Sequence, residues 1–356
     1  MNSNIKSSGE KQSLDKDAEI NKEKLFLNFV KNNILILILI AVFLLGIAVS
    51  KSFTRIYNIQ NILINISTIG VLALGQTLVM LVKEIDLSQG SLMAFSPIAA
   101  ISLSQLILSK FDLKVIQGGN YVVTGMSLII IFTIVVGILT GLISGLINVK
   151  GKVPSLIVTL GMLYALRGIA YILSKGHPLY FTRLQGFKWL GTSKLFNIPI
   201  CFVVYLAIGI IGILLLKYTK IGPRIYSTGG NEKAAIYSGV KTDLWKIIAF
   251  AFSGFCAAIG ALIYSSRLES VEAAQAAGYE LSSIAIVVIG GTTLEGGRGS
   301  IFGTIMAGMI LGIVINIITL IGLVVWYQTI IEGLIIISAT FAYIYKRMTG
   351  RAVLQM

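Results

Sequence analysis

Residues 198–217 read IPICFVVYLAIGIIGILLLK, residues 218–243 read YTKIGPRIYSTGGNEKAAIYSGVKTD, and residues 244–266 read LWKIIAFAFSGFCAAIGALIYSS. The first and third stretches are almost entirely apolar, and each has the roughly 20 residues that a helix needs to cross a bilayer. The stretch between them carries basic and turn-forming residues. This alternation predicts an all-α polytopic membrane protein, because helices satisfy their own backbone hydrogen bonds in lipid.

The same pattern extends along the chain and predicts about ten transmembrane helices. The expected spans are 33–50, 59–82, 88–109, 122–148, 153–174, 198–217, 244–266, 279–294, 300–321 and 324–345. Segment 279–294 has a short apolar core that is followed at once by Gly290-Gly291. It is therefore expected to be either a crossing helix or a broken or re-entrant one.

Composition excludes a soluble enzyme, since 12% of residues are charged and 56% are apolar. The single histidine and the two cysteines, which form no CxxC pair, predict no metal site. Paired catalytic carboxylates, HExxH and Gly-x-Ser-x-Gly are missing, so no catalytic site is expected. Residues 1–30 are expected to form a disordered cytoplasmic tail. Residues 31–348 are expected to form the transmembrane domain.

The net charge of +14 lies in the polar segments between the apolar runs. It is therefore read as an orientation signal and not as a nucleic-acid surface. With the N-terminus inside, 19 Lys and Arg fall on the cytoplasmic side and 9 on the outer side. The positive-inside rule then places both termini in the cytoplasm.

The polar segment 218–243 is expected to contain a short helix. Gly230 and Asn231 belong to a turn signal, and Asn231 can cap a helix that begins at Glu232 and ends at Gly239. Ala234 and Ala235 would leave a small, smooth surface that fits a groove on another protein. The alternative is a solvated loop helix.

Further residues are candidates for a transport path or for a gate in it. Asp86 and Ser88 stand just before the third span, where Gly90 and Ser91 allow another helix to approach closely. The alternative for these four residues is a helix cap with small-residue packing.

Arg167 and Glu332 are charged residues within spans, where they form a polar pathway or an internal ion pair, or else snorkel to the interface. Gly290 and Gly291 are expected in a sharp, closely packed turn between helices. The order of a phosphate-binding loop is missing around them.

Four stretches together resemble the ribose and galactoside permease family of bacterial ATP-binding-cassette importers. They cover residues 58–345 in the family's order and spacing, and they are 85–91 (IDLSQGS), 153–168 with Leu166-Arg167-Gly168, 229–240 (GGNEKAAIYSGV) and 278–299 with GGTTLEGGRG. Arg167 falls on the family's Leu-Arg-Gly pattern. Lys83-Glu84 stand where the family usually has two glycines, and Ser282-Ser283 stand where an acidic residue is common. Both departures touch expected path or gate elements, so the resemblance does not identify the transported sugar.

The resemblance implies a type II importer fold in the bacterial cytoplasmic membrane. An extracytoplasmic binding protein would deliver a pentose or hexose to two permease subunits, identical or different. The helix beginning at Glu232 would be the coupling helix, which docks on a cytoplasmic ATPase subunit. That partner would use the ATP, and no cofactor would bind to this chain.

Other functions stay open at this point. A permease of the same architecture could carry nucleosides or another small polar solute. An ion-coupled secondary carrier would usually need buried carboxylates, and Glu332 is the only acidic residue that the sequence places deep in a span.

Overall fold

The computed structural model describes residues 33–110, 120–180 and 187–323, and in the last segment residues 327–331, 333, 334, 337 and 341. Six of the described helices are long and apolar enough to cross a membrane. They are α2 (Ile56–Leu81), α4 (Asn120–Gly151, apolar from Met126), α5 (Ser155–Ser174), α7 (Ile200–Tyr218), α10 (Thr242–Leu268) and α12 (Ile301–Leu320). A multi-pass, mostly helical membrane protein is thus confirmed, and the total of ten crossings stays a prediction.

The remaining elements complete the described chain, and most of them are short. The helices are Asn33–Val49, α3 (Gln89–Lys110), α6 (Trp189–Thr192), α8 (Ile221–Gly230), α9 (Glu232–Tyr237) and α11 (Tyr279–Ile289). Two antiparallel ladders pair β1 (Leu179–Tyr180) with β4 (Ser270–Val271) and β2 (Lys194–Leu195) with β3 (Ile198–Pro199).

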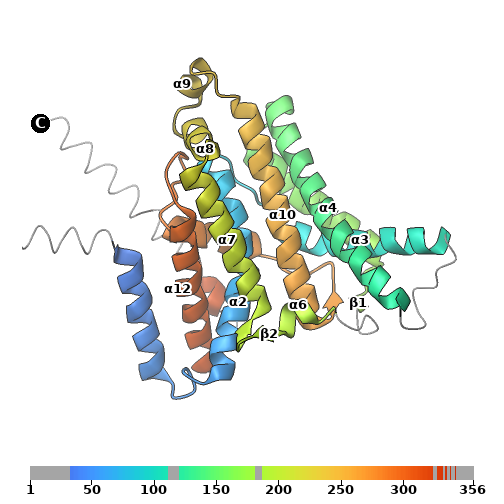
Figure 1. Cartoon of the computed structure of the whole chain (residues 1–356), viewed down its shortest axis with the longest axis vertical. Coiled ribbons are helices and arrows are strands. Elements are labelled where there is room, and N and C mark those ends of the chain that lie inside the picture. The colour runs from blue at the N-terminus through green and yellow to red at the C-terminus, as the bar shows by residue number, and fades with distance from the viewer. Residues whose placement is uncertain are drawn as a thin grey trace, which may run out of the picture.

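Helix α10 lies at the centre of the bundle and packs against α2, α3 and α4 (Figure 1). Its contact with α4 uses glycines spaced four residues apart, at positions 137, 141 and 145. A Cβ on Gly254 of α10 would lie 2.1 Å from the carbonyl oxygen of Gly137. Small residues therefore let these two backbones approach, which is how helices pack in lipid without a hydrophobic driving force.

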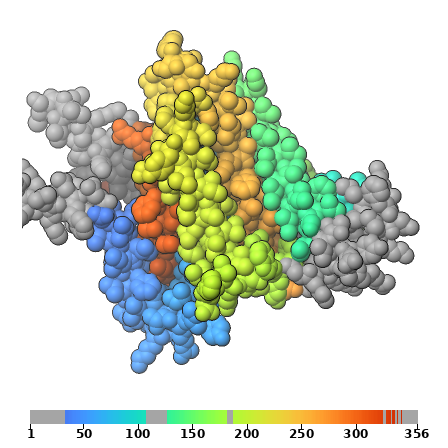
Figure 2. Space-filling view, in the orientation of Figure 1, coloured from blue at the N-terminus to red at the C-terminus, as the bar shows by residue number. Residues whose placement is uncertain are grey.

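Helices α8 and α9 lie together at one end of the molecule, which we call the α9 end; α6 and the strand ladders lie at the opposite end (Figures 1 and 2). The loop 290–300 also belongs to the α9 end. Gly297 N donates to the carbonyl oxygen of Leu81 at 2.9 Å, and the Tyr226 hydroxyl of α8 donates to that of Gly299 at 3.0 Å. Three polar segments that are far apart in sequence thus meet at this end.

Segment 279–294 is a broken helix. Helix α11 has only 11 residues, or about 16 Å of rise, roughly half the hydrocarbon thickness of a bilayer. It ends because Gly291 adopts a φ of +86°. Residues 272–278, between β4 and α11, are not helical. The chain therefore passes from the strand ladders to the α9 end first through a series of turns and then as helix.

A second break follows α2, where residues 82–88 are not helical; we call them the re-entrant segment. Gln89, the first residue of α3, bonds to the carbonyl oxygen of Leu72 at 3.1 Å. Leu72 lies nine residues before the end of α2, so the re-entrant segment turns back into the bundle by about 13 Å. The third predicted span therefore begins inside the bundle and not at its surface.

The close contact at Gly290 generates a stability prediction. A Cβ there would lie 2.7 Å from the backbone carbon of Gly303 at the start of α12. We expect Gly290→Ala to destabilise the protein by about 1–3 kcal/mol, because two backbones would have to separate. Gly161→Ala on α5 is the matched control, since a Cβ there has no neighbour within 4 Å. Thermal unfolding in detergent measures both, and equal midpoints would contradict this reading of the contact.

Candidate functional site

The re-entrant segment is held inside the bundle by side chains of α2 and α10. The Asp86 carboxylate is buried and accepts from Ser88 N at 2.9 Å, from Ser88 Oγ at 2.6 Å and from Ser253 Oγ of α10 at 2.6 Å. The side-chain amide of Gln76 pairs with the backbone N–H and C=O of Asp86, both at 3.2 Å, in the orientation that satisfies both groups. Asp86 therefore anchors the segment and does not cap α3.

Gln89 connects four helices through one amide. Its Nε2 donates to the carbonyl oxygen of Leu72 in α2 and to Ser253 Oγ in α10, the latter at 2.8 Å. Its Oε1 accepts from Ser283 Oγ of α11 at 2.8 Å. No local sequence pattern singled out this glutamine, although it lies at the centre of the contacts between the two breaks.

The two breaks touch at Gly90. A Cβ on Gly90 would lie 2.0 Å from Glu280 Oε2 and 2.6 Å from the carbonyl oxygen of Ala276. The close approach expected at this glycine is therefore made by the start of α11. Ser91 Oγ donates to the carbonyl oxygen of Ser88 at 2.8 Å and so closes the first turn of α3.

Arg167 holds the turns that precede α11. Its Nη1 donates to the carbonyl oxygens of Ala273 and Gln275, both at 2.7 Å. Gln275 in turn donates to the carbonyl oxygen of Met93 in α3 at 2.8 Å. The sequence left open a polar pathway, an internal ion pair or snorkelling for Arg167. In the structure its guanidinium acts as an interior clamp, because it supplies donors to backbone carbonyls that the broken helix leaves unpaired.

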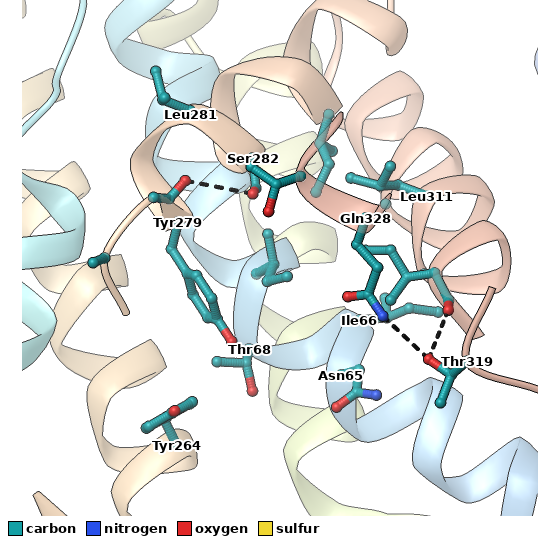
Figure 3. Close-up of a pocket in the computed structure, with 18 of the residues that line it drawn as sticks. Asn65, Ile66, Thr68, Tyr264, Tyr279, Leu281, Ser282, Leu311, Thr319 and Gln328 are labelled. Atoms are coloured by element: carbon teal, nitrogen blue, oxygen red, sulfur yellow. Dashed lines mark hydrogen bonds between the residues drawn. The ribbon is translucent and has the colours of Figure 1, made fainter. Parts of the chain in front are cut away.

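Beside the break at α11 lies a cavity of about 560 Å³ (Figure 3). It is bounded by α2, α10, α11, α12 and the helical residues that begin at Tyr327. Its polar lining comprises Asn65, Thr68, Tyr264, Arg267, Tyr279, Ser282, Thr319, Gln328 and Thr329. In Figure 3 Tyr279 and Tyr264 lie on one side of the cavity, and Gln328 and Thr319 lie on the other.

The cavity combines aromatic faces with hydrogen-bonding groups. The rings of Tyr264 and Tyr279 pack edge to face with their centroids 6.1 Å apart. Arg267 Nη1 donates to Asn65 Oδ1 at 2.6 Å on the adjacent wall. Such a lining suits a small polar molecule, and a discontinuous helix that opens into a cavity is typical of transporter sites.

The predicted path and gate residues that the structure describes do not line this cavity. They lie behind its wall, in the contacts that hold the two helix breaks in place. Asp86, Ser88, Gly90, Ser91 and Arg167 form the contacts around the two breaks, and Gly290 and Gly291 form the turn after α11. None of them is among the residues that line the cavity. Glu332 lies outside the described residues.

Residues 218–243 contain two helices where the sequence predicted one. The expected helix is α9, and the Asn231 side chain caps it by accepting from Ala234 N at 3.1 Å. Gly239 follows with a φ of +79°. The helix α8 was not predicted, because Gly229-Gly230 read as a turn. In the structure Gly230 is the last residue of α8, and the turn begins only at Asn231.

The expected surface of α9 also needs a correction. Ala235 is only 3% exposed, because it faces the body of the protein on the inner side of α9. Ala234, on another face, is exposed. The exposed apolar residues of α9 are therefore Ala234, Ile236 and Tyr237, the last of which is 91% exposed.

What the sequence missed is mostly uncharged. Gln89, Ser253 and Gln275 hold the breaks, and each stands within or beside an apolar run. The only available signal was a strong hydrogen-bonding side chain in a membrane segment, which needs a partner across helices.

Comparison with known proteins gives one family. The family model described as the branched-chain amino acid transport system permease component matches residues 58–340. No solved structure matches.

Curated relatives align along nearly the whole chain. The ribose import permease protein of Haemophilus influenzae is 35% identical, over 89% of this chain and 93% of its own length. Those of Escherichia coli K12 and Bacillus subtilis 168 are 33% and 34% identical, over 87% and 84% of this chain and 91% and 89% of their own lengths. The chain therefore belongs to this family of permease components of ATP-binding-cassette importers.

Proposed function

We propose that this protein forms the membrane path of an ATP-driven importer for a monosaccharide, a pentose such as ribose or a hexose. The observation that carries the proposal is the polar and aromatic cavity at the start of the broken helix α11. The relatives named for ribose import favour a sugar over other small polar solutes such as nucleosides.

The cavity offers what a monosaccharide needs. Tyrosine rings can cover the C–H face of a pyranose or furanose ring, as at other sites that bind small polar ligands in largely apolar walls. The amide of Asn65 and the guanidinium of Arg267 can exchange their mutual bond for bonds to hydroxyl groups. Such exchange suits transport, since the sugar must also leave.

The number of membrane crossings, the orientation and the subunit composition are proposed from the sequence. The permease spans the bacterial cytoplasmic membrane about ten times in a type II arrangement, with both termini and the tail 1–30 in the cytoplasm. The α9 end then faces the cytoplasm, and the positive-inside distribution supports this orientation. Residues 31–348 form the permease domain, and a second permease subunit, the same or a sister, completes the path.

The energy for transport is supplied by another subunit. A cytoplasmic ATPase subunit binds and hydrolyses ATP, and an extracytoplasmic binding protein delivers the sugar. The coupling loop 218–243 meets the ATPase through α9, whose exposed Ala234, Ile236 and Tyr237 suit an apolar groove. No cofactor binds to the permease itself.

One observation favours the alternative of an ion-coupled carrier. Two acidic residues, Asp86 and Glu280, are buried inside the bundle, where the sequence had placed only Glu332. Asp86 already accepts from three donors, so its oxygens are poorly placed to bind an ion. The energy source is therefore the property to test.

We expect radiolabelled ribose or another monosaccharide to enter proteoliposomes only when the permease is reconstituted with its ATPase, its binding protein and ATP. Ionophores that collapse sodium and proton gradients should leave uptake unchanged. Uptake by the permease alone under an imposed gradient would establish the carrier instead, and competition between sugars and nucleosides would identify the solute.

Arg267→Met should lower the maximal rate of uptake about tenfold, because it removes charge-assisted hydrogen bonds from the cavity wall. The rate is measured with saturating sugar-loaded binding protein, so that affinity for that protein does not limit it. Tyr164→Leu on α5 is the control, since Tyr164 is 71% exposed and does not line the cavity. Equal rates in the two variants would exclude the cavity as the path.

Ala234→Arg should prevent the ATPase from co-purifying with the permease, because it places a long charged side chain on the exposed face of α9. Tyr180→Arg makes a similar change on an exposed residue at the opposite end and should leave co-purification intact. Retention of the ATPase by the Ala234 variant would show that α9 is not the docking element.

A further inference from the structure

One lysine joins the α9 helix to the re-entrant segment. Lys246, in the second turn of α10, places its Nζ 2.8 Å from Glu232 Oε1 in the first turn of α9. The same Nζ lies 3.1 Å from Glu84 Oε1. Two acidic residues from separate parts of the chain therefore share one cation.

This ion-pair group is largely withdrawn from solvent. The side chains of Lys246 and Glu84 are 14% and 12% exposed, and that of Glu232 is 42% exposed. Asn148 Nδ2 of α4 donates to Glu84 Oε2 at 3.5 Å and to the carbonyl oxygen of Val153 at 2.9 Å. A pair this sheltered is screened less than a surface pair, and removal of one partner leaves a poorly solvated charge.

Two side chains of α10 contact the re-entrant segment. Lys246 holds its outer part at Glu84, and Ser253 holds its inner part at Asp86. These two α10 residues are seven positions apart, which is about 10 Å along the helix. From there the chain continues to Gly90, which packs on α11 beside the cavity.

We propose that Lys246 is a positioning residue for transport, which couples movement of α9 to the re-entrant segment by holding Glu232 and Glu84 together. The proposal rests on the proposed docking of the ATPase at α9. When the ATPase displaces α9, Glu232 moves with it, and the shared cation passes that displacement to Glu84. The re-entrant segment then shifts against α11 and the cavity that α11 borders.

The proposal is tested in the full complex of permease, ATPase and binding protein. Lys246→Met should leave the ATPase bound and hydrolysing ATP, while the sugar delivered per ATP falls about fivefold, the size expected for loss of a strongly coupled pair. Glu84→Gln should give a similar fall, although it leaves the pair between Lys246 and Glu232 intact. The double variant should be no worse than Lys246→Met alone, because both changes remove the same tie.

Lys150→Met is the matched control, since Lys150 is exposed on α4, outside the proposed docking helix, and no described residue forms an ion pair with it. It should keep the wild-type ratio of sugar to ATP. An equal fall in this control would reduce the effect to a general loss of positive charge. Loss of ATPase co-purification in Lys246→Met would assign Lys246 to docking instead and overturn the proposal.

A second measurement needs no partner protein. Hydrogen exchange of the permease in detergent or nanodiscs should speed up in Lys246→Met at residues 83–88 and 232–238 together, and stay unchanged in Lys150→Met. Unchanged exchange at residues 83–88 would refute the tie directly. Failure of the wild-type complex to transport sugar would refute the proposed function but leave this exchange result standing.

Discussion

Every backbone N–H and C=O group inside a bilayer needs a partner within the protein, and this fold breaks two helices where that demand is strictest. The re-entrant segment and residues 272–278 have no helical ladder of their own. Gln76 pairs with the backbone of Asp86, and Arg167 covers two carbonyl oxygens ahead of α11. Without such side chains neither break would be tolerated at this depth.

The breaks also determine where the molecule can rearrange. The backbone hydrogen bonds of a continuous membrane helix join residues of that same helix, so movement of neighbouring helices does not require them to change. A segment held by a few side chains from other helices can change partners when those helices move. The re-entrant segment lies between the α9 end and the start of α11, so rearrangement there would reach both the coupling loop and the cavity.

The sequence predicted what depends on local signals. Long apolar runs located the described spans, and the cap at Asn231 located α9. Helix α8 was missed because Gly229-Gly230 is a local turn signal; Gly229 is instead required where a Cβ would lie 1.9 Å from the carbonyl oxygen of Leu81. The re-entrant segment and the cavity were missed for a related reason. Their partners come from four or more helices, and no spacing in the sequence connects Tyr264 with Tyr279 or Gln89 with Ser253.

The interactions that hold the re-entrant segment differ along its length. Near the α9 end Glu84 is held by an ion pair with Lys246, and both side chains are sheltered from solvent, so separation would leave poorly solvated charges. Deeper inside, Asp86 and Gln89 are held by hydroxyl and amide groups, whose loss would leave buried polar groups without partners. Both attachments are therefore costly to open, and the segment is expected to move together with the side chains that hold it. A segment built in this way can follow a movement of α9 and still keep its backbone satisfied within the bilayer.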